Sequence, residues 1–66
     1  MTLTDTTIAN IEARYEDRHP KVTACMINIW AEEDGFGIGT MEVYKDKRDE
    51  CYDINIDINS QEIFIV

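Results

Sequence analysis

The hydrophobic pattern of the chain changes its period at Pro20, the only proline. Before this residue, Ile8, Ile11 and Tyr15 recur at the spacing of one helix face. After it, apolar residues alternate with polar ones in several short runs, which is the pattern of half-buried strands. A proline pushes the preceding residue out of the α conformation, so a helix must end before Pro20. The sequence therefore predicts one helix followed only by strands.

We expect the helix over residues about 4–18, capped by Thr4 or Asp5, with Leu3 packing back onto Ile8 if Thr4 is the cap. The strands are expected over residues about 22–32, 36–46, 51–58 and 62–66. The turns between them are too short for crossover connections, which require a dozen residues or more. The predicted fold class is thus α+β: one N-terminal helix on one face of a four-stranded antiparallel meander sheet. We expect residues 1–66 to form a single compact domain.

The pairing of the first two strands depends on the length of the loop at Asp34-Gly35, a hairpin signal. A two-residue turn would place Ile27 opposite the charged Glu42. A three-residue loop over 33–35 pairs Ile27 with Met41 instead. Because a slip of one residue sends every side chain to the other face, we favour the three-residue loop.

Turns at Arg48-Asp49 and Ser60-Gln61 then complete the predicted register. They place apolar residues from all four strands on the face beneath the helix: Cys25, Val43 and Ile54; Ile27, Met41, Ile56 and Ile65; Ile29, Gly39, Ile58 and Ile63. Gly39 is expected to let the helix backbone approach closely.

The opposite, open face is predicted to mix carboxylates with large apolar side chains. Its expected rows are Ala24, Tyr44 and Asp53; Met26, Glu42, Asn55 and Val66; Asn28, Thr40, Asp57 and Phe64; Trp30, Ile38, Asn59 and Glu62. Aromatic residues and Met are enriched where a protein meets a partner, so one interpretation is a binding surface. The other is that the aromatic residues pair across strands while the acids keep the face hydrated. The candidate partner-binding residues are Trp30, Glu42, Tyr44, Asp49, Glu50, Asp53, Asp57, Glu62 and Phe64.

The net charge of the chain indicates what kind of partner it can bind. The chain has fourteen Asp and Glu against six Lys and Arg, a net charge of −8. Residues 49–66 contain five acids and no Lys or Arg, whereas Lys45, Lys47 and Arg48 gather at one turn. Contact with phosphates requires clustered cations, so we expect no direct binding to nucleic acid or to an anionic membrane. A larger protein with a basic surface is the expected partner.

Two motifs suggest ligand sites but fit strand and turn chemistry better. Asp53-Ile54-Asn55-Ile56-Asp57 resembles the start of a calcium loop, but Ile58 replaces its glycine and Phe64 stands where its final Glu belongs. The glycines at 35, 37 and 39 lack the following helix and the Lys of a phosphate-binding loop, and are interpreted as turn and bulge residues. We expect neither a metal nor a cofactor.

The remaining reactive residues give no catalytic constellation. His19 has no acid-base partner in sequence and lies at a helix end, and Ser60 lacks an activating base. Cys25 and Cys51 are expected on opposite faces of the sheet and therefore unbridged. We expect a protein that is not an enzyme. The Met1 end also lacks the basic and apolar pattern of a secretory signal, so a cytoplasmic location is expected, in a bacterial or host cell.

In size and charge the chain resembles phage-encoded anti-CRISPR and anti-restriction proteins and the immunity proteins that neutralise nuclease toxins. That resemblance implies a small inhibitor or decoy, a nucleic-acid mimic that blocks a basic nucleic-acid-binding site. The alternative is a non-catalytic assembly module that homodimerises through its open sheet face or an edge strand.

Overall fold

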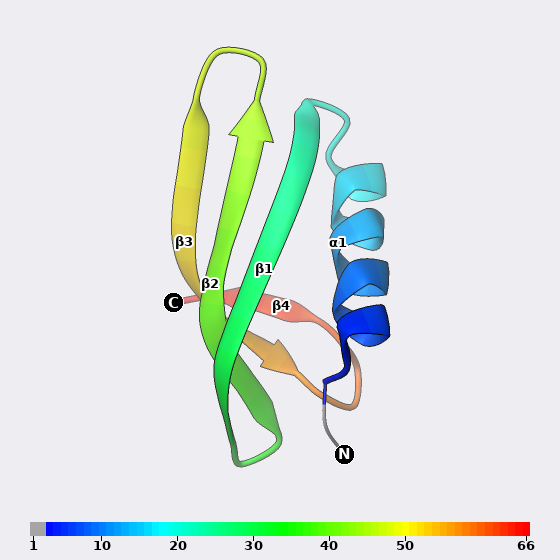
Figure 1. Ribbon diagram of the computed structural model, residues 1–66, viewed down its shortest axis with the longest axis vertical. Coiled ribbons are helices and arrows are strands. Elements are labelled where there is room, and N and C mark those ends of the chain that lie inside the picture. The colour runs from blue at the N-terminus through cyan, green and yellow to red at the C-terminus, as the bar shows by residue number, and fades with distance from the viewer. Residues whose placement is uncertain (1–2) are drawn as a thin grey trace.

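The computed structural model describes residues 3–66 and confirms the predicted α+β architecture (Figure 1). Helix α1 (Asp5–Arg18) precedes four antiparallel strands in the order β1 (Val22–Glu33), β2 (Phe36–Lys45), β3 (Asp49–Asp57) and β4 (Ile63–Ile65). The helix packs against β1.

The ends of α1 follow from capping chemistry. Thr4 is the N-cap, and its hydroxyl oxygen accepts a hydrogen bond from the backbone N–H of Thr7 at 3.1 Å. At the other end, His19 leaves the helical conformation directly before Pro20, and its N–H donates to the carbonyl of Glu16. Both predicted boundaries are thus confirmed to within one residue.

The hairpin between β1 and β2 has the predicted pairing but reaches it differently. Ile27 pairs with Met41. The loop is not the expected three residues: Glu33 pairs with Phe36, leaving Asp34 and Gly35 as a two-residue turn, both with positive φ (52° and 81°). A bulge between Ile29 and Ala31 supplies the extra residue instead.

The pairing of β2 with β3 differs from the prediction by four residues. Tyr44 pairs with Asp49, and the N–H of Lys45 donates to the carbonyl of Arg48 at 3.0 Å, so the turn lies before Asp49 and not at Arg48-Asp49. Consequently Met41 pairs with Tyr52 rather than with Ile56. An even shift leaves every side chain on its predicted face.

The last strand is shorter than expected and is displaced by two residues. Ile56 pairs with Ile63, and Ile54 pairs with Ile65. The predicted partner of Ile56 was Ile65, which was expected to lie in the core. Ile65 is instead 56% exposed, so that placement was wrong.

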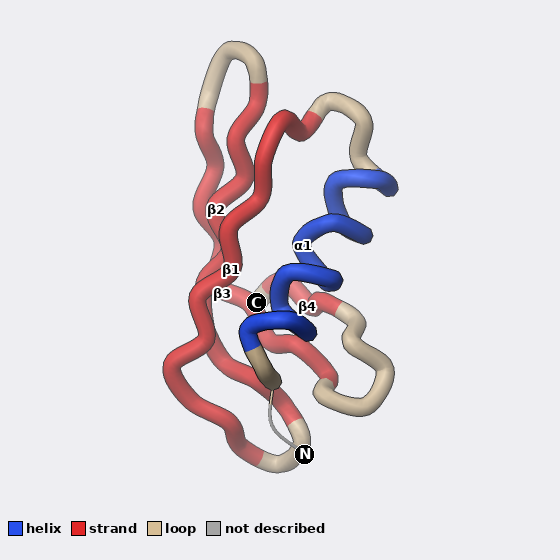
Figure 2. Tube along the Cα trace, turned by 45° about the vertical axis from the view of Figure 1, so that its right-hand side comes forward, coloured by secondary structure: helices blue, strands red, loops and turns tan. Residues whose placement is uncertain are grey.

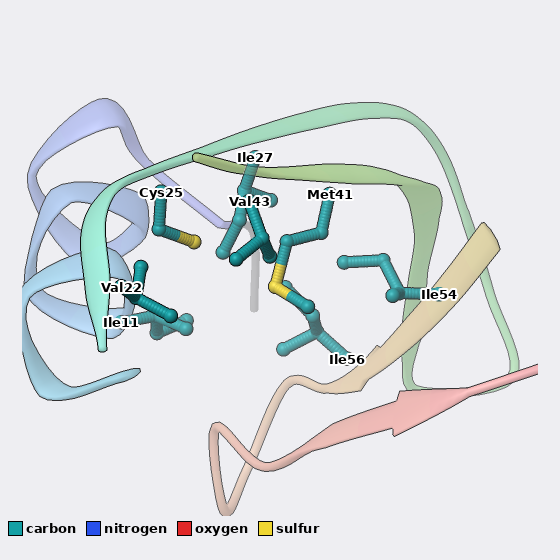
Figure 3. Close-up of a cluster of buried hydrophobic side chains, with 8 residues drawn as sticks. All are labelled: Ile11, Val22, Cys25, Ile27, Met41, Val43, Ile54 and Ile56. Carbon is teal, nitrogen blue, oxygen red and sulfur yellow. The ribbon is translucent and has the colours of Figure 1, made fainter. Parts of the chain in front are cut away.

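The core lies between α1 and the inner face of the sheet. Its buried side chains come from the helix and from β1, β2 and β3, as Figure 3 shows: Ile11, Val22, Cys25, Ile27, Met41, Val43, Ile54 and Ile56. A Cβ on Gly39 would overlap the carbonyl of Asn28. The close approach at this glycine is therefore that of β1, and the prediction that the helix approaches it was wrong.

The sheet curls, so both of its outer strands lie near the helix (Figures 1 and 2). On the β1 side, a carboxylate oxygen of Glu12 accepts a hydrogen bond from the N–H of Ile27 at 2.7 Å. On the β4 side, the guanidinium of Arg14 donates to the carbonyl of Gln61 at 2.7 Å. Within residues 3–66, no helix has the length and apolar character needed to cross a membrane.

Candidate functional site

Three carboxylates lie together on the open face of β2 and β3. Asp49 is opposite Tyr44, Glu42 is opposite Cys51, and Asp53 is opposite Thr40. Glu42 is thus diagonal to both aspartates, at about 7–8 Å between backbones. Asp49 and Asp53 are exposed and Glu42 is half-buried. Strand alternation alone therefore gathers three acids on one surface.

Tyr44 fixes the position of the central acid. Its hydroxyl donates to a carboxylate oxygen of Glu42 at 2.5 Å and also lies 3.9 Å from the sulfur of Met26. This hydrogen bond raises the pKa of Tyr44, with burial adding to the effect. Met26 pairs with Glu42 across the strands and is 52% exposed. We call the surface formed by Met26, Glu42, Tyr44, Asp49, Cys51 and Asp53 the acidic face.

Glu50 does not belong to the acidic face, although it was predicted to share a binding surface with these acids. It pairs with Val43 and lies on the inner side of the sheet. Its carboxylate forms ion pairs with Lys45 and Arg48, each at 2.7 Å. The neighbouring Lys45 first and Tyr52 second lower the pKa of Glu50 to about 2. This charge is already satisfied within the chain.

Trp30 is also away from the acidic face. It was expected opposite Ile38, but Ala31 occupies that position because Trp30 is the bulge residue of β1. Its side chain is 65% exposed, beside a hollow that Leu3 and Ile8 also line. Trp30 therefore lies near the start of the helix.

Asp57 and Glu62 lie at the turn between β3 and β4. The Asp57 carboxylate accepts hydrogen bonds from the N–H groups of Asn59 (2.9 Å) and Ser60 (3.1 Å). The carbonyl of Glu62 accepts from the N–H of Asp57 at 2.9 Å. The Asp57 carboxylate therefore holds a turn.

Phe64 lies in a second, apolar part of the open face. It pairs with Asn55, is 50% exposed, and packs edge-on against Phe36 with ring centroids 6.4 Å apart. Phe36, Met26 and Cys51 were not among the binding residues predicted from the sequence. Met26 was already placed on this face by alternation and could have been selected; Phe36 required the correct register.

The other reactive side chains are His19, which contacts Tyr15, and the two cysteines. His19 stacks on Tyr15 with ring centroids 4.0 Å apart, and its Nδ1 lies 2.9 Å from the Tyr15 carbonyl. Cys25 and Cys51 are both free thiols, Cys25 buried and Cys51 exposed, as predicted. In the part of the chain that the structure describes, no cluster of three or more His, Cys, Asp or Glu side chains is placed to hold a metal ion.

No protein-family model matches the chain, and no curated protein or solved structure is significantly similar to it.

Proposed function

We propose that this protein is a non-catalytic inhibitor or decoy whose acidic face binds a basic, nucleic-acid-binding site on a larger protein. The observation that carries the proposal is that Glu42, Asp49 and Asp53 share one surface and that none of them forms an ion pair with Lys or Arg of residues 3–66. Among residues 3–66, the only ion pairs are the two made by Glu50 on the other side of the sheet. The acidic face therefore keeps its charge available for a partner's Arg or Lys.

The apolar residues of the face supply the second part of the interaction. Met26 lies beside Glu42 on β1 and Tyr44 lies opposite Asp49, so cations binding there would contact a thioether and an aromatic ring as well as carboxylates. Charge complementarity accelerates association, and desolvated apolar contacts slow dissociation. Phe36 and Phe64 add an apolar contact elsewhere on the open face of the sheet.

The spacing of the acids favours a compact decoy over an extended copy of a duplex. Asp49 and Asp53 are four residues apart on one strand, about 13 Å. A nucleic-acid duplex carries about eight charges over that length. With three carboxylates in the same span, the acidic face matches the charge of a few phosphates only. We infer that it occupies a short part of a nucleic-acid channel and that its apolar residues compensate for the missing charge.

One observation favours the assembly module as a second candidate. Phe64, Ile65 and Val66 are all at least half exposed, on or next to the edge strand β4. Pairing of that edge with a second copy would bury them. Such a dimer would strengthen with protein concentration and persist at high salt, whereas binding through the acidic face weakens as salt rises.

The test is capture from a bacterial lysate on the immobilised protein at low and high salt, with added duplex DNA or RNA as competitor. The proposal predicts a captured nucleic-acid-binding protein that is released by salt and excluded by the competitor. Capture that neither salt nor nucleic acid reduces would contradict it.

A further inference from the structure

Among residues 3–66, no strand pairs with the outer edge of β4. Two hydrogen bonds define how β4 faces β3: Asp57 N–H to the Glu62 carbonyl, and Val66 N–H to the Asp53 carbonyl, each at 2.9 Å. In an antiparallel pair such bonds involve alternate residues, so Phe64 also turns its backbone groups toward β3. The N–H and C=O groups of Ile63 and Ile65 therefore point away from the sheet, and β4 is its last strand.

A hollow lies beside this edge. A space of about 280 Å³ separates the second half of α1 from β4, with Ile11, Ile63 and Ile65 among its apolar lining. A second hollow of about 380 Å³ continues toward Tyr52 and Lys45. Both are lined by Tyr15, Arg18 and His19, so the two hollows adjoin along the C-terminal part of the helix. We call the two hollows together the β4 groove.

The β4 groove is basic on an otherwise acidic molecule. Its lining includes four of the six Lys and Arg residues of the chain: Arg14, Arg18, Lys21 and Lys45. The acids that line it are Glu50 and Glu62, and the ion pair between Glu50 and Lys45 neutralises one charge of each sign. Arg14, Arg18 and Lys21 then remain against Glu62, so the lining is still net positive. The groove thus has the opposite charge from the acidic face.

We propose that the β4 groove binds an extended acidic peptide segment, which adds to the sheet as a strand beside β4. Backbone hydrogen bonds to Ile63 and Ile65 supply affinity, as in other cases of strand addition. Alternate side chains of the added strand point toward α1, where carboxylates meet Arg18 and its neighbouring cations. The protein then has two binding surfaces, one for a basic partner and one for an acidic segment.

Charge also argues against two other occupants. A second copy of this chain would present its own β4, whose residues 63–65 are Ile-Phe-Ile and offer no carboxylate to the cations. A nucleic-acid strand would extend beyond the groove, where the net charge of −8 on the protein would repel its phosphates. An extended acidic peptide is short enough to keep its charges inside the groove.

The experiment is titration with a short, capped peptide of alternating Glu and Val, followed by NMR shifts and amide hydrogen exchange. We expect the amides of Ile63 and Ile65 to shift and to exchange more slowly when the peptide is bound. A matched peptide of alternating Lys and Val should not bind. Equal binding of both peptides, or slow exchange of Ile63 and Ile65 that grows with protein concentration in the absence of peptide, would overturn the proposal.

Two variants test the geometry separately from the charge. Ile65→Pro removes an outward N–H without touching the hydrogen bonds between β3 and β4, and should abolish peptide binding. Arg18→Glu should weaken binding about tenfold or more, whereas Lys47→Glu, the same charge change at a residue of the β2–β3 turn that does not line the groove, should weaken it less. Unchanged binding by a folded Ile65→Pro variant overturns the proposal. If that variant does not fold, equal effects of Arg18→Glu and Lys47→Glu overturn it.

Discussion

Glu50 and its neighbour Asp49 are adjacent in the sequence but belong to different regions of the molecule. Asp49 is exposed on the acidic face opposite Tyr44, whereas Glu50 lies on the inner face between Lys45 and Arg48. Strand alternation separates the two carboxylates, and the turn before them supplies cations to only one. Consecutive acids in a strand therefore do not form one charged surface. Each acid must first be assigned to a face of the sheet before its charge is added to that of its neighbours.

The sharpest difference between the two faces is expected in stability. Ile56 is fully buried and Ile27 is 7% exposed, both on the inner face. Replacing either by Ala removes apolar contacts and leaves a cavity, so each variant should lose about 2–5 kcal/mol of unfolding free energy. That is a large part of the ~3–10 kcal/mol expected for a chain of this length. Urea denaturation measures the loss.

Ile65→Ala is the matched control for these core variants. Ile65 is the same residue type but is 56% exposed at the end of β4. Its truncation should cost about 1 kcal/mol or less, because most of the removed surface is already hydrated. A cost for Ile65→Ala equal to that for Ile56→Ala would show that β4 packs differently.

The sequence was sufficient for the fold because its main signals are local. The period change at Pro20 and the hairpin signal at Asp34-Gly35 each depend on a few neighbouring residues, and the structure has a helix end and a hairpin there. Thr4, one of the two predicted caps, is the N-cap, but the hairpin loop has two residues and not the three that were favoured. Alternation also assigned the core strand residues to the inner face, and an even register error could not reverse that assignment.

What the sequence did not determine is which residues lie opposite one another. The extra residue that sets the β1–β2 pairing is Trp30, and no local signal distinguishes a bulge there from a longer loop. The turn before β3 was misplaced because Lys45 to Arg48 contains neither Gly nor Pro. The bulge explains why Trp30 was grouped with residues of a different surface. Glu50 was grouped with Asp49 because the acids were counted along the sequence and not by face.

The reactivity of the two cysteine thiols compares the acidic face with the inner face of the sheet. Cys51 is exposed on the acidic face, whereas burial raises the pKa of the Cys25 thiol to about 11, with Glu12 and Glu16 adding to the effect. A thiol reagent should modify Cys51 quickly and Cys25 roughly a hundredfold more slowly, since Cys25 must wait for the fold to open. Mass spectrometry over time gives both rates. Equal rates, or a disulfide between the two, would contradict this arrangement.

A smaller effect is expected from acid on the Glu50 ion pairs. The pKa of Glu50 is lowered from 4.5 to about 2 by Lys45 first and Tyr52 second. Its stabilisation is therefore complete above about 4.5 and is lost as the pH falls toward about 2. Urea midpoints of wild type should fall across this window more steeply than those of Glu50→Gln. Asp17→Asn, at an exposed helix acid that has no ion pair within the described part of the chain, should follow wild type. Parallel profiles for wild type and Glu50→Gln would remove the role assigned to these ion pairs.

Charge reversal must avoid acids that hold the fold. Asp57 accepts two backbone hydrogen bonds at its turn, and Glu12 accepts one from Ile27 on the edge of β1. Reversal of either would confuse a loss of binding with a loss of structure. Asp53 and Asp17 are both exposed and form no ion pair with any of residues 3–66, so they can be reversed and compared directly.

The most direct test of the acidic face is competition between this protein and nucleic acid for the captured partner, with Asp53→Lys compared against Asp17→Lys. The two variants have the same net charge but change different surfaces. We expect Asp53→Lys to weaken displacement of nucleic acid by about tenfold or more, since attraction becomes repulsion at the contact, and Asp17→Lys to act like wild type. Equal loss in both variants would mean that only overall charge matters, and no loss in Asp53→Lys would contradict the assignment of the acidic face as the binding surface.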